Sequence, residues 1–269
     1  MNSRETYELW MQSDYFDLET KKELECIKDD PDEIEERFYR DLEFGTGGLR
    51  GIIGAGTNRM NIYTVRKASQ GLANYLLKNV KDAAPRGVAI AYDSRHMSPE
   101  FAMEAARVFA ANGIVSYLFD ELRPTPELSF AVRHLKAAAG IVITASHNPK
   151  EYNGYKVYGE DGGQLPLEGS EAVLGEIKAI TDITAVQPAD KEEALKKDLI
   201  RMIGKDVDDI YIENLKTLLV NPEEIKKAAD SMKIVYTPLH GSGNKPVRRI
   251  LSEAGFKNVL VVREQELPD

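Results

Sequence analysis

Short apolar strands alternate with capped helices in the first half of this chain, and this alternation restricts the fold more than any other feature. Residues 88–92 form an apolar run, and Ser98-Pro99 then supplies a helix N-cap followed by proline at the first helical position. A second strand (114–119), a second helix that starts at Thr125-Pro126, and a third strand (140–143) follow. Short strand–helix–strand connections are typical of parallel sheets. We therefore predict an α/β fold with a mainly parallel, mixed sheet sandwiched by helices.

The third apolar run ends in a polar turn, Thr144-Ala145-Ser146-His147-Asn148-Pro149. Proline has no backbone N–H and restricts the residue before it, so the strand cannot continue through this turn. In open α/β sheets, ligands bind at the carboxyl ends of the strands. We expect Ser146 at that edge, beside the loops that follow the two neighbouring strands, residues 93–96 and 123–126.

After this turn the chain is expected to reverse direction. Asn153-Gly154 is typical of a tight hairpin turn. Residues 154–158 then form a predicted strand with Lys156 and Tyr158 on one face, because side chains alternate along a strand.

Three roles for Ser146 are compatible with the residues alone. The serine can simply cap its turn, as serine before Asn-Pro often does. A hydrolase nucleophile is disfavoured, because no Gly-x-Ser-x-Gly elbow is present and the adjacent His147 rarely has the geometry of a triad base. A phosphoryl carrier fits more of the sequence, because cations and a glycine-rich loop can neutralise a phosphate. The relevant groups are Arg50, Arg95, Lys150, Lys156 and the glycine-rich residues 44–51.

Composition limits the classes of partner. The formal net charge of -9 argues against nucleic-acid binding, which requires cations along the phosphate backbone. No apolar run is long enough to cross a bilayer, so no membrane partner is expected. The only cysteine, Cys26, excludes an internal disulfide and indicates a cytoplasmic location. Composition does not determine the oligomeric state.

The chain divides into three predicted parts. Residues 1–40 form an acidic helical extension, residues 41–205 a first domain, and residues 206–269 the start of a second domain. The second domain repeats the order strand, polar loop, helix and strand, but only two strands precede the last residue. Two strands and one helix make a poor core. The sequence therefore predicts either an added strand of the first domain or a fragment of a longer protein.

Several motifs together resemble the α-D-phosphohexomutase family, the phosphoglucomutases and phosphomannomutases. The serine turn, followed by Asn153-Gly154-Tyr155-Lys156-Val157, is similar to the phosphoserine loop of that family. Three more motifs match in order: Phe44-Gly45-Thr46-Gly47-Gly48-Leu49-Arg50-Gly51, Tyr92-Asp93-Ser94-Arg95, and Thr237-Pro238-Leu239-His240-Gly241-Ser242-Gly243. The helical extension resembles the long bacterial branch. The resemblance implies phosphohexomutase domain 1 and the start of a similar domain 2.

The resemblance also implies a reaction and its residues. Hexose 1-phosphate and hexose 6-phosphate, of glucose or mannose, interconvert through a phosphoserine and a hexose 1,6-bisphosphate, which also acts as activator. Ser146 carries the phosphoryl group and gives a phosphate oxygen to Mg²⁺. Lys156 and Arg50 serve acid/base chemistry and charge stabilisation, and His147 assists. The implied substrate- or phosphate-binding residues are Gly47, Gly48, Arg50, Thr144, Asn148 and Lys156.

Other motifs of the family are missing. We find no Asp-x-Asp-x-Asp-Arg metal loop, sugar-selecting loop or distal phosphate loop in these 269 residues. We therefore expect an inactive N-terminal fragment that binds sugar phosphates only in part. A phosphopentomutase of the same superfamily and a non-catalytic sugar-phosphate-binding module stay open as alternatives.

Overall fold

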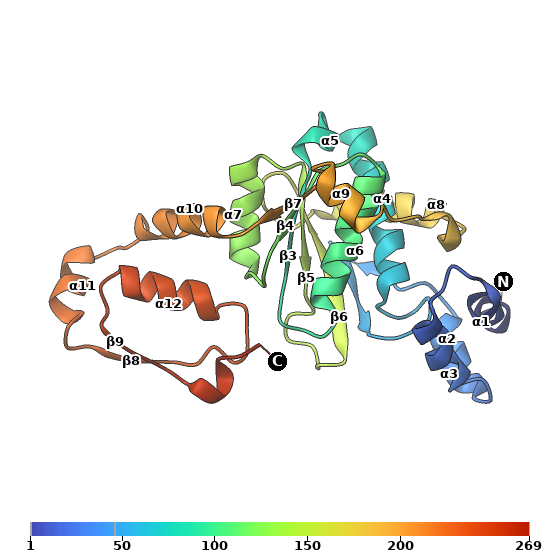
Figure 1. The fold of residues 1–269 in the computed structure, drawn as a ribbon, viewed down its shortest axis with the longest axis horizontal. Helices are drawn as coiled ribbons and strands as arrows, with labels where there is room; N and C mark the ends of the chain where they lie inside the picture. The colour runs from blue at the N-terminus through green and yellow to red at the C-terminus, as the bar shows by residue number, and fades with distance from the viewer. Residues whose placement is uncertain (1, 46, 269) are drawn as a thin grey trace.

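A seven-stranded sheet forms the centre of the protein (Figure 1). The structure is a computed structural model that describes residues 2–45 and 47–268. The strand order is β1-β2-β6-β5-β3-β4-β7. The strands are Phe44–Gly45 (β1), Gly48–Ile52 (β2), Val88–Tyr92 (β3), Ser116–Phe119 (β4), Ala139–Ile143 (β5), Tyr152–Tyr158 (β6) and Ile200–Ile203 (β7). The pairs β5–β3, β3–β4 and β4–β7 are parallel, and the pairs β1–β2, β2–β6 and β6–β5 are antiparallel. The predicted α/β class with a mixed sheet is confirmed.

Helices cover both faces of the sheet, and strands β3 and β5 are buried along their whole lengths. Alternate strand residues enter two separate cores, because successive side chains of a strand point to opposite faces. Ile90 belongs to the core under helices α4, α6 and α8, whereas Ala89 belongs to the core under α7. The helices of this body are Ile62–Asn79 (α4), Ala83–Arg86 (α5), Ser98–Ala111 (α6), Thr125–Leu135 (α7), Leu167–Ala179 (α8) and Lys191–Lys196 (α9).

The N-terminal residues form three helices that pack against the start of α4 (Figure 1). They are Ser3–Gln12 (α1), Leu18–Glu25 (α2) and Pro31–Phe38 (α3). Trp10 is the centre of their aromatic cluster: it stacks on Phe16 at 4.2 Å between ring centroids and meets Tyr63 of α4 edge-on. Buried aromatic rings contribute large apolar areas, so this cluster fixes the extension to the main body.

The C-terminal residues form a second, smaller unit to one side of the main sheet (Figure 1). Its strands Lys233–Tyr236 (β8) and Asn258–Val261 (β9) are parallel and enclose the crossover helix Asn244–Glu253 (α12). Helices Lys205–Lys216 (α10) and Pro222–Ala228 (α11) lead into it. Neither β8, β9 nor α12 contains a buried residue among the described ones, which distinguishes this unit from the first sheet.

Two local predictions differ from the structure. Asn153-Gly154 is not a hairpin turn but part of β6. The Asn153 amide donates to His96 O and Ser98 Oγ, and a Cβ on residue 154 would lie 2.6 Å from Thr144 O. Both residues are therefore explained by close packing inside the sheet. The glycine-rich residues 44–51 form most of β1 and β2 rather than a loop.

No helix among the described residues combines the length and apolar character that a bilayer span requires.

Candidate active site

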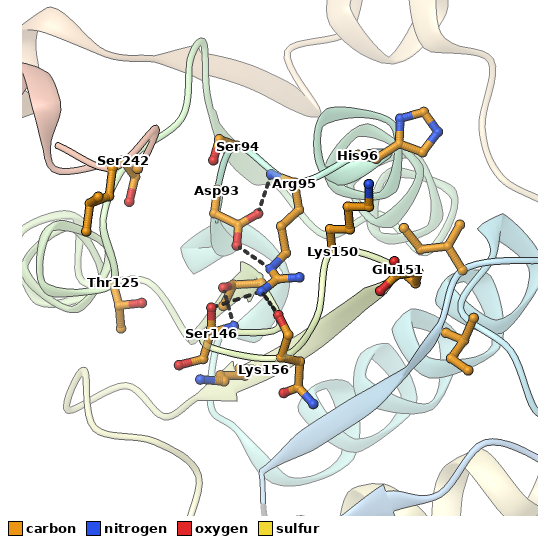
Figure 2. Close-up of a pocket in the computed structure, with 16 residues that line it drawn as sticks. Asp93, Ser94, Arg95, His96, Thr125, Ser146, Lys150, Glu151, Lys156 and Ser242 are labelled. Carbon is orange, nitrogen blue, oxygen red and sulfur yellow. Dashed lines mark hydrogen bonds and ion pairs between the residues drawn. The ribbon is translucent and has the colours of Figure 1, made fainter. Parts of the chain in front are cut away.

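The loops at the carboxyl ends of β3 and β5 line one large cavity of about 920 Å³ (Figure 2). Residues 93–96 follow β3, Thr125 is the first residue of α7, directly after the loop that follows β4, and Ser146, Asn148 and Lys150 follow β5. The expected gathering of these three loops is thus confirmed. Leu239, Gly241 and Ser242 of the second unit line the same cavity, so both parts of the chain contribute to its wall.

Ser146 lies exposed on this wall in an unusual backbone conformation. Its φ of 60° is in the left-handed region, which costs a non-glycine residue roughly 1–2 kcal/mol. The Ser146 amide donates to Thr144 Oγ1 at 3.0 Å, and the Asn148 amide donates to Ala145 O at 3.2 Å. These bonds form a tight turn that directs the serine away from the buried end of β5.

His147 lies beside the serine, with 3.4 Å between Ser146 Oγ and His147 Nδ1. Thr144 and Asn148 line the cavity together with Ser146. The Thr144 hydroxyl is engaged in the turn, but Asn148 Oδ1 is buried without a hydrogen-bond partner in the part of the chain that the structure describes. Substrate or phosphate binding by Thr144 and Asn148 therefore stays a prediction.

The Arg95 guanidinium is bound by the backbone of the serine loop rather than open to an anion, and dashed lines mark its bonds (Figure 2). Its Nη1 donates to Pro149 O and Tyr152 O, and its Nη2 donates to Ser146 O and Asn148 O. The guanidinium is thereby occupied by the backbone, which corrects our grouping of Arg95 with the cations free to face a phosphate.

Lys156 and Arg50 come from neighbouring strands. Gly48 of β2 is paired with Lys156 of β6, which places Arg50 two residues along β2 on the same face of the sheet. Burial lowers the pKa of Lys156, and the positive charge of Arg50 lowers it further, whereas Asp93 acts in the opposite direction. The lysine therefore releases its proton more readily than a free lysine does.

A second cavity, of about 340 Å³, adjoins the first one at Lys156. Arg50, Gly48 and Arg40 line it together with Lys156. Lys156 lines both cavities, so it connects the serine wall to the Arg50 wall. Neither Arg50 nor the Lys156 ammonium forms a hydrogen bond or ion pair with residues 2–45 or 47–268, and both cations are open to an anionic ligand.

The two candidate glycines have packing roles in the structure. The Gly47 amide donates to Ser170 Oγ at 3.0 Å, and Gly47 has a φ of 71° that favours glycine. A Cβ on Gly48 would lie 2.2 Å from Tyr155 O of the adjacent strand. Phosphate binding by Gly47 and Gly48 therefore stays a prediction. Thr46 of the same motif lies outside the described residues.

The described residues do not form a magnesium site by themselves. No group of three or more His, Cys, Asp or Glu side chains is suitably clustered in residues 2–45 and 47–268. Asp93, a carboxylate of the large cavity, accepts hydrogen bonds from Ser98 Oγ and from the Arg95 amide. A phosphate on Ser146 would add one oxygen ligand to this wall, and the other ligands of a Mg²⁺ ion are not provided by these side chains.

The sequence predicted that these strand-end loops meet, but it missed two contributions to the cavity wall. It did not identify the backbone-holding role of Arg95, although Tyr92-Asp93-Ser94-Arg95 was recognised as a motif. It also gave no role to the buried Asn153, whose Asn-Gly context indicated a turn. A buried amide requires hydrogen-bond partners, but the sequence carried no signal that Asn153 is buried.

Comparisons with known proteins agree with this architecture. The family model described as phosphoglucomutase/phosphomannomutase, alpha/beta/alpha domain I, matches residues 41–184, and the model for domain II matches residues 209–269. The chain is 37% identical over 268 residues to a phosphoglucomutase of Staphylococcus saprophyticus, which covers 97% of this chain and 45% of that protein. A phosphoglucomutase of Staphylococcus aureus is 40% identical over 240 residues, which covers 88% of this chain and 42% of that protein.

A solved structure gives the same result. A crystal structure from Thermus thermophilus, assigned there as a phosphomannomutase, superposes with a TM-score of 0.65 at 28% identity. The match covers 86% of this chain and 47% of the other. The chain thus spans less than half the length of each of these relatives. Because the domain I model alone matches more than half of the sequence, the chain belongs to the phosphoglucomutase/phosphomannomutase family.

Proposed function

We propose that this chain carries the phosphoserine part of a phosphohexomutase active site. Hexose 1-phosphate and hexose 6-phosphate, of glucose or mannose, would interconvert through a phosphoryl group on Ser146 and a hexose 1,6-bisphosphate. The observation that supports this proposal most directly is that exposed Ser146 shares one cavity with Lys156, whose ammonium has no ion-pair partner among the described residues. A hydrolase triad is disfavoured, because Asp93 is bonded to Arg95 and Ser98 rather than to His147.

In the proposed transfer, a sugar hydroxyl attacks the phosphorus atom on Ser146. The new sugar O–P bond forms while the bond between Ser146 Oγ and phosphorus breaks. The hydroxyl proton passes to Lys156 in its neutral form, and the lowered pKa of Lys156 makes that form accessible. Arg50 lies on the same face of the sheet and stabilises the phosphoryl charge.

The return step uses the same groups in reverse. His147 Nδ1 lies 3.4 Å from Ser146 Oγ, so the histidine can hydrogen-bond the serine oxygen once the phosphoryl group has left. The bisphosphate then presents its other phosphate to Ser146, and Lys156 returns the proton to the sugar oxygen. Mg²⁺ would neutralise phosphate charge in this family reaction, with one phosphate oxygen on Ser146 as a ligand.

The proposal divides the work along the chain. Residues 41–205 would form the phosphoserine domain and residues 206–269 part of a second domain. We also propose that the 269 residues alone do not complete the isomerisation, because their described side chains supply no metal-binding cluster. Sugar phosphates are the proposed partners, and the cytoplasm is the proposed location.

Intact-mass spectrometry of the purified chain tests the phosphoserine directly. We expect incubation with glucose 1,6-bisphosphate and Mg²⁺ to add about 80 Da, the mass of one phosphoryl group. Ser146→Ala should abolish the addition, and Lys156→Met should slow it. An addition of the same size in Ser146→Ala would refute the assignment of Ser146, and no addition to the wild-type chain would count against phosphoryl transfer by this chain. Parallel assays with glucose 1-phosphate, mannose 1-phosphate and ribose 1-phosphate would show whether any sugar is isomerised.

A further inference from the structure

Four backbone carbonyls of the serine loop and the start of β6 converge on one guanidinium, that of Arg95. Arg95 Nη1 lies 2.8 Å from Pro149 O and 2.9 Å from Tyr152 O. Arg95 Nη2 lies 3.0 Å from Ser146 O and 2.6 Å from Asn148 O. Three of the bonded carbonyls therefore lie in the loop that joins β5 to β6, and the fourth belongs to Tyr152, the first residue of β6.

The donor count leaves Arg95 no N–H group for a phosphate. A guanidinium has five N–H donors, four of them on its two terminal nitrogens. The four carbonyls use those four donors, and the remaining Nε faces Asp93 Oδ2 at 3.5 Å. Arg95 could bind a phosphoryl group on Ser146 only by giving up hydrogen bonds to the backbone carbonyls. Phosphate binding by Arg95 is therefore energetically unfavourable.

A hydrogen-bond chain holds Arg95 in place from the opposite side. Asp93 Oδ1 accepts from the Arg95 amide at 3.0 Å and from Ser98 Oγ at 2.8 Å. Asn153 Nδ2, on β6, donates to Ser98 Oγ at 2.9 Å. Arg95 is thereby connected to the first turn of α6 and to β6.

The conformation that Arg95 supports is a strained one. Ser146 has a φ of 60°, and such a conformation persists only where the surroundings impose it. Trans peptide units direct the N–H of the next residue opposite to each carbonyl, so the His147 and Lys150 amides point away from the guanidinium. Neither amide has an acceptor among the described residues.

We propose that Arg95 is a positioning residue that holds Ser146 in its left-handed conformation by binding the loop carbonyls, and that it is not a phosphate ligand. This inference rests on the proposed role of Ser146 as phosphoryl carrier. Arg95 acts through the loop, so its removal affects the placement of the serine and not the charge around the transferred phosphate.

Hydrogen–deuterium exchange of the unphosphorylated chain tests the loop itself. We expect Arg95→Ala to accelerate exchange of the Ser146, Asn148 and Tyr152 amides by at least about tenfold, because local opening becomes easier. Arg95→Lys should show most of this effect, since one ammonium cannot bind two pairs of carbonyls in the geometry of a fork. Circular dichroism would establish whether each variant is folded. If Arg95→Ala does not fold, the exchange rates of Arg95→Lys decide the outcome.

Arg86→Ala is the matched control. Arg86 also donates to backbone carbonyls, those of Lys136 and Ala137, but these lie just before the amino end of β5, whereas the serine loop follows its carboxyl end, and they are outside both cavities. We expect the serine-loop amides of Arg86→Ala to exchange at the same rates as those of the wild-type chain. Wild-type exchange rates in both Arg95 variants would overturn the proposal.

A kinetic measurement distinguishes positioning from phosphate binding. In the intact-mass assay, loss of positioning should lower the maximal rate of Ser146 phosphorylation by roughly 100-fold and leave the half-saturating bisphosphate concentration unchanged. A phosphate-ligand role predicts a raised half-saturating concentration with normal loop exchange, and that result would refute the inference. If the wild-type chain accepts no phosphoryl group, the proposed function fails, whereas the exchange measurement still decides whether Arg95 holds the loop.

Discussion

A buried carboxyl group, Glu127, meets a half-buried one, Asp208, where the main body joins the second unit, and Glu127 is expected to keep its proton near neutral pH. Glu127, in the first turn of α7, is 1% exposed and faces Asp208 of α10. Burial, assisted by the hydrogen bond and the negative charge of Asp208, raises the pKa of Glu127 from 4.5 to about 8. Burial opposes ionisation of Asp208 as well, but hydrogen bonds from Arg123 and Glu127 hold its pKa below the usual value.

This arrangement makes folding stability fall with pH. Above about pH 4.5 the unfolded chain releases the Glu127 proton, while the folded chain retains it up to about pH 8. The folded state therefore binds more protons in this window, and the free energy of unfolding decreases as pH rises through it. At about 1.36 kcal/mol for each unit of pKa, the upper bound is about 5 kcal/mol. Because real protein interiors screen charges better than a dry medium does, we expect the free energy of unfolding to decrease by about 2 kcal/mol or more across this window.

Glu127→Gln should abolish this pH dependence. A glutamine amide has nearly the shape of the protonated acid and can donate to Asp208, but it cannot ionise. We expect the variant to gain stability over the wild type steadily between about pH 5 and about pH 8, measured by urea unfolding with circular dichroism. Glu168→Gln is the matched control, because Glu168 also lies in a first helical turn but is exposed. Parallel stability–pH curves for the wild type and Glu127→Gln would refute a protonated Glu127.

Three further predictions test the strands and the loop of the site. Gly154→Ala should destabilise the fold by about 2–3 kcal/mol, because the new Cβ would lie within 2.9 Å of two backbone oxygens. The exposed Gly175→Ala should instead stabilise the fold by about 0.5–1 kcal/mol. Urea midpoints of the two variants that move in the same direction would contradict this prediction. Arg50→Gln should raise the pKa of Lys156 without restoring the usual value, since burial remains, and an unchanged ¹³C NMR titration of the lysine would rule this out. Ser146→Gly should be about 1 kcal/mol more stable than Ser146→Ala, because glycine adopts a φ of 60° without strain; equal melting temperatures would exclude strain at this position.

The elements of the first sheet were predictable where their signals lie within a few residues. The apolar run at 88–92 and the Ser98-Pro99 helix start both correspond to elements of the structure, β3 and the beginning of α6. The glycine-rich strand β2 was not recognised as a strand, because glycine usually weakens strands. Its glycines are tolerated there because Gly48 approaches the backbone of β6, a partner more than 100 residues away in sequence.

The candidate site was predictable as a place but not as a set of contacts. Ser146 and Lys156 do line one cavity, as strand ends and side-chain alternation indicated. Arg95 could not be distinguished from Arg50 by its residue type, since both are arginines near the same loops. Only the structure shows that one guanidinium is bound by four carbonyls and that the other is open to the smaller cavity.

The sequence by itself determined the alternation of strands and helices and the position of Ser146 at the end of a buried strand. Those properties depend on periodicity, caps and proline, which act over neighbouring residues. The tertiary structure alone decided the register of β2 against β6, the use of the Arg95 guanidinium and the burial of Glu127 against Asp208. Each of these depends on which distant residues share one desolvated space, and that is set by the packing of the whole chain.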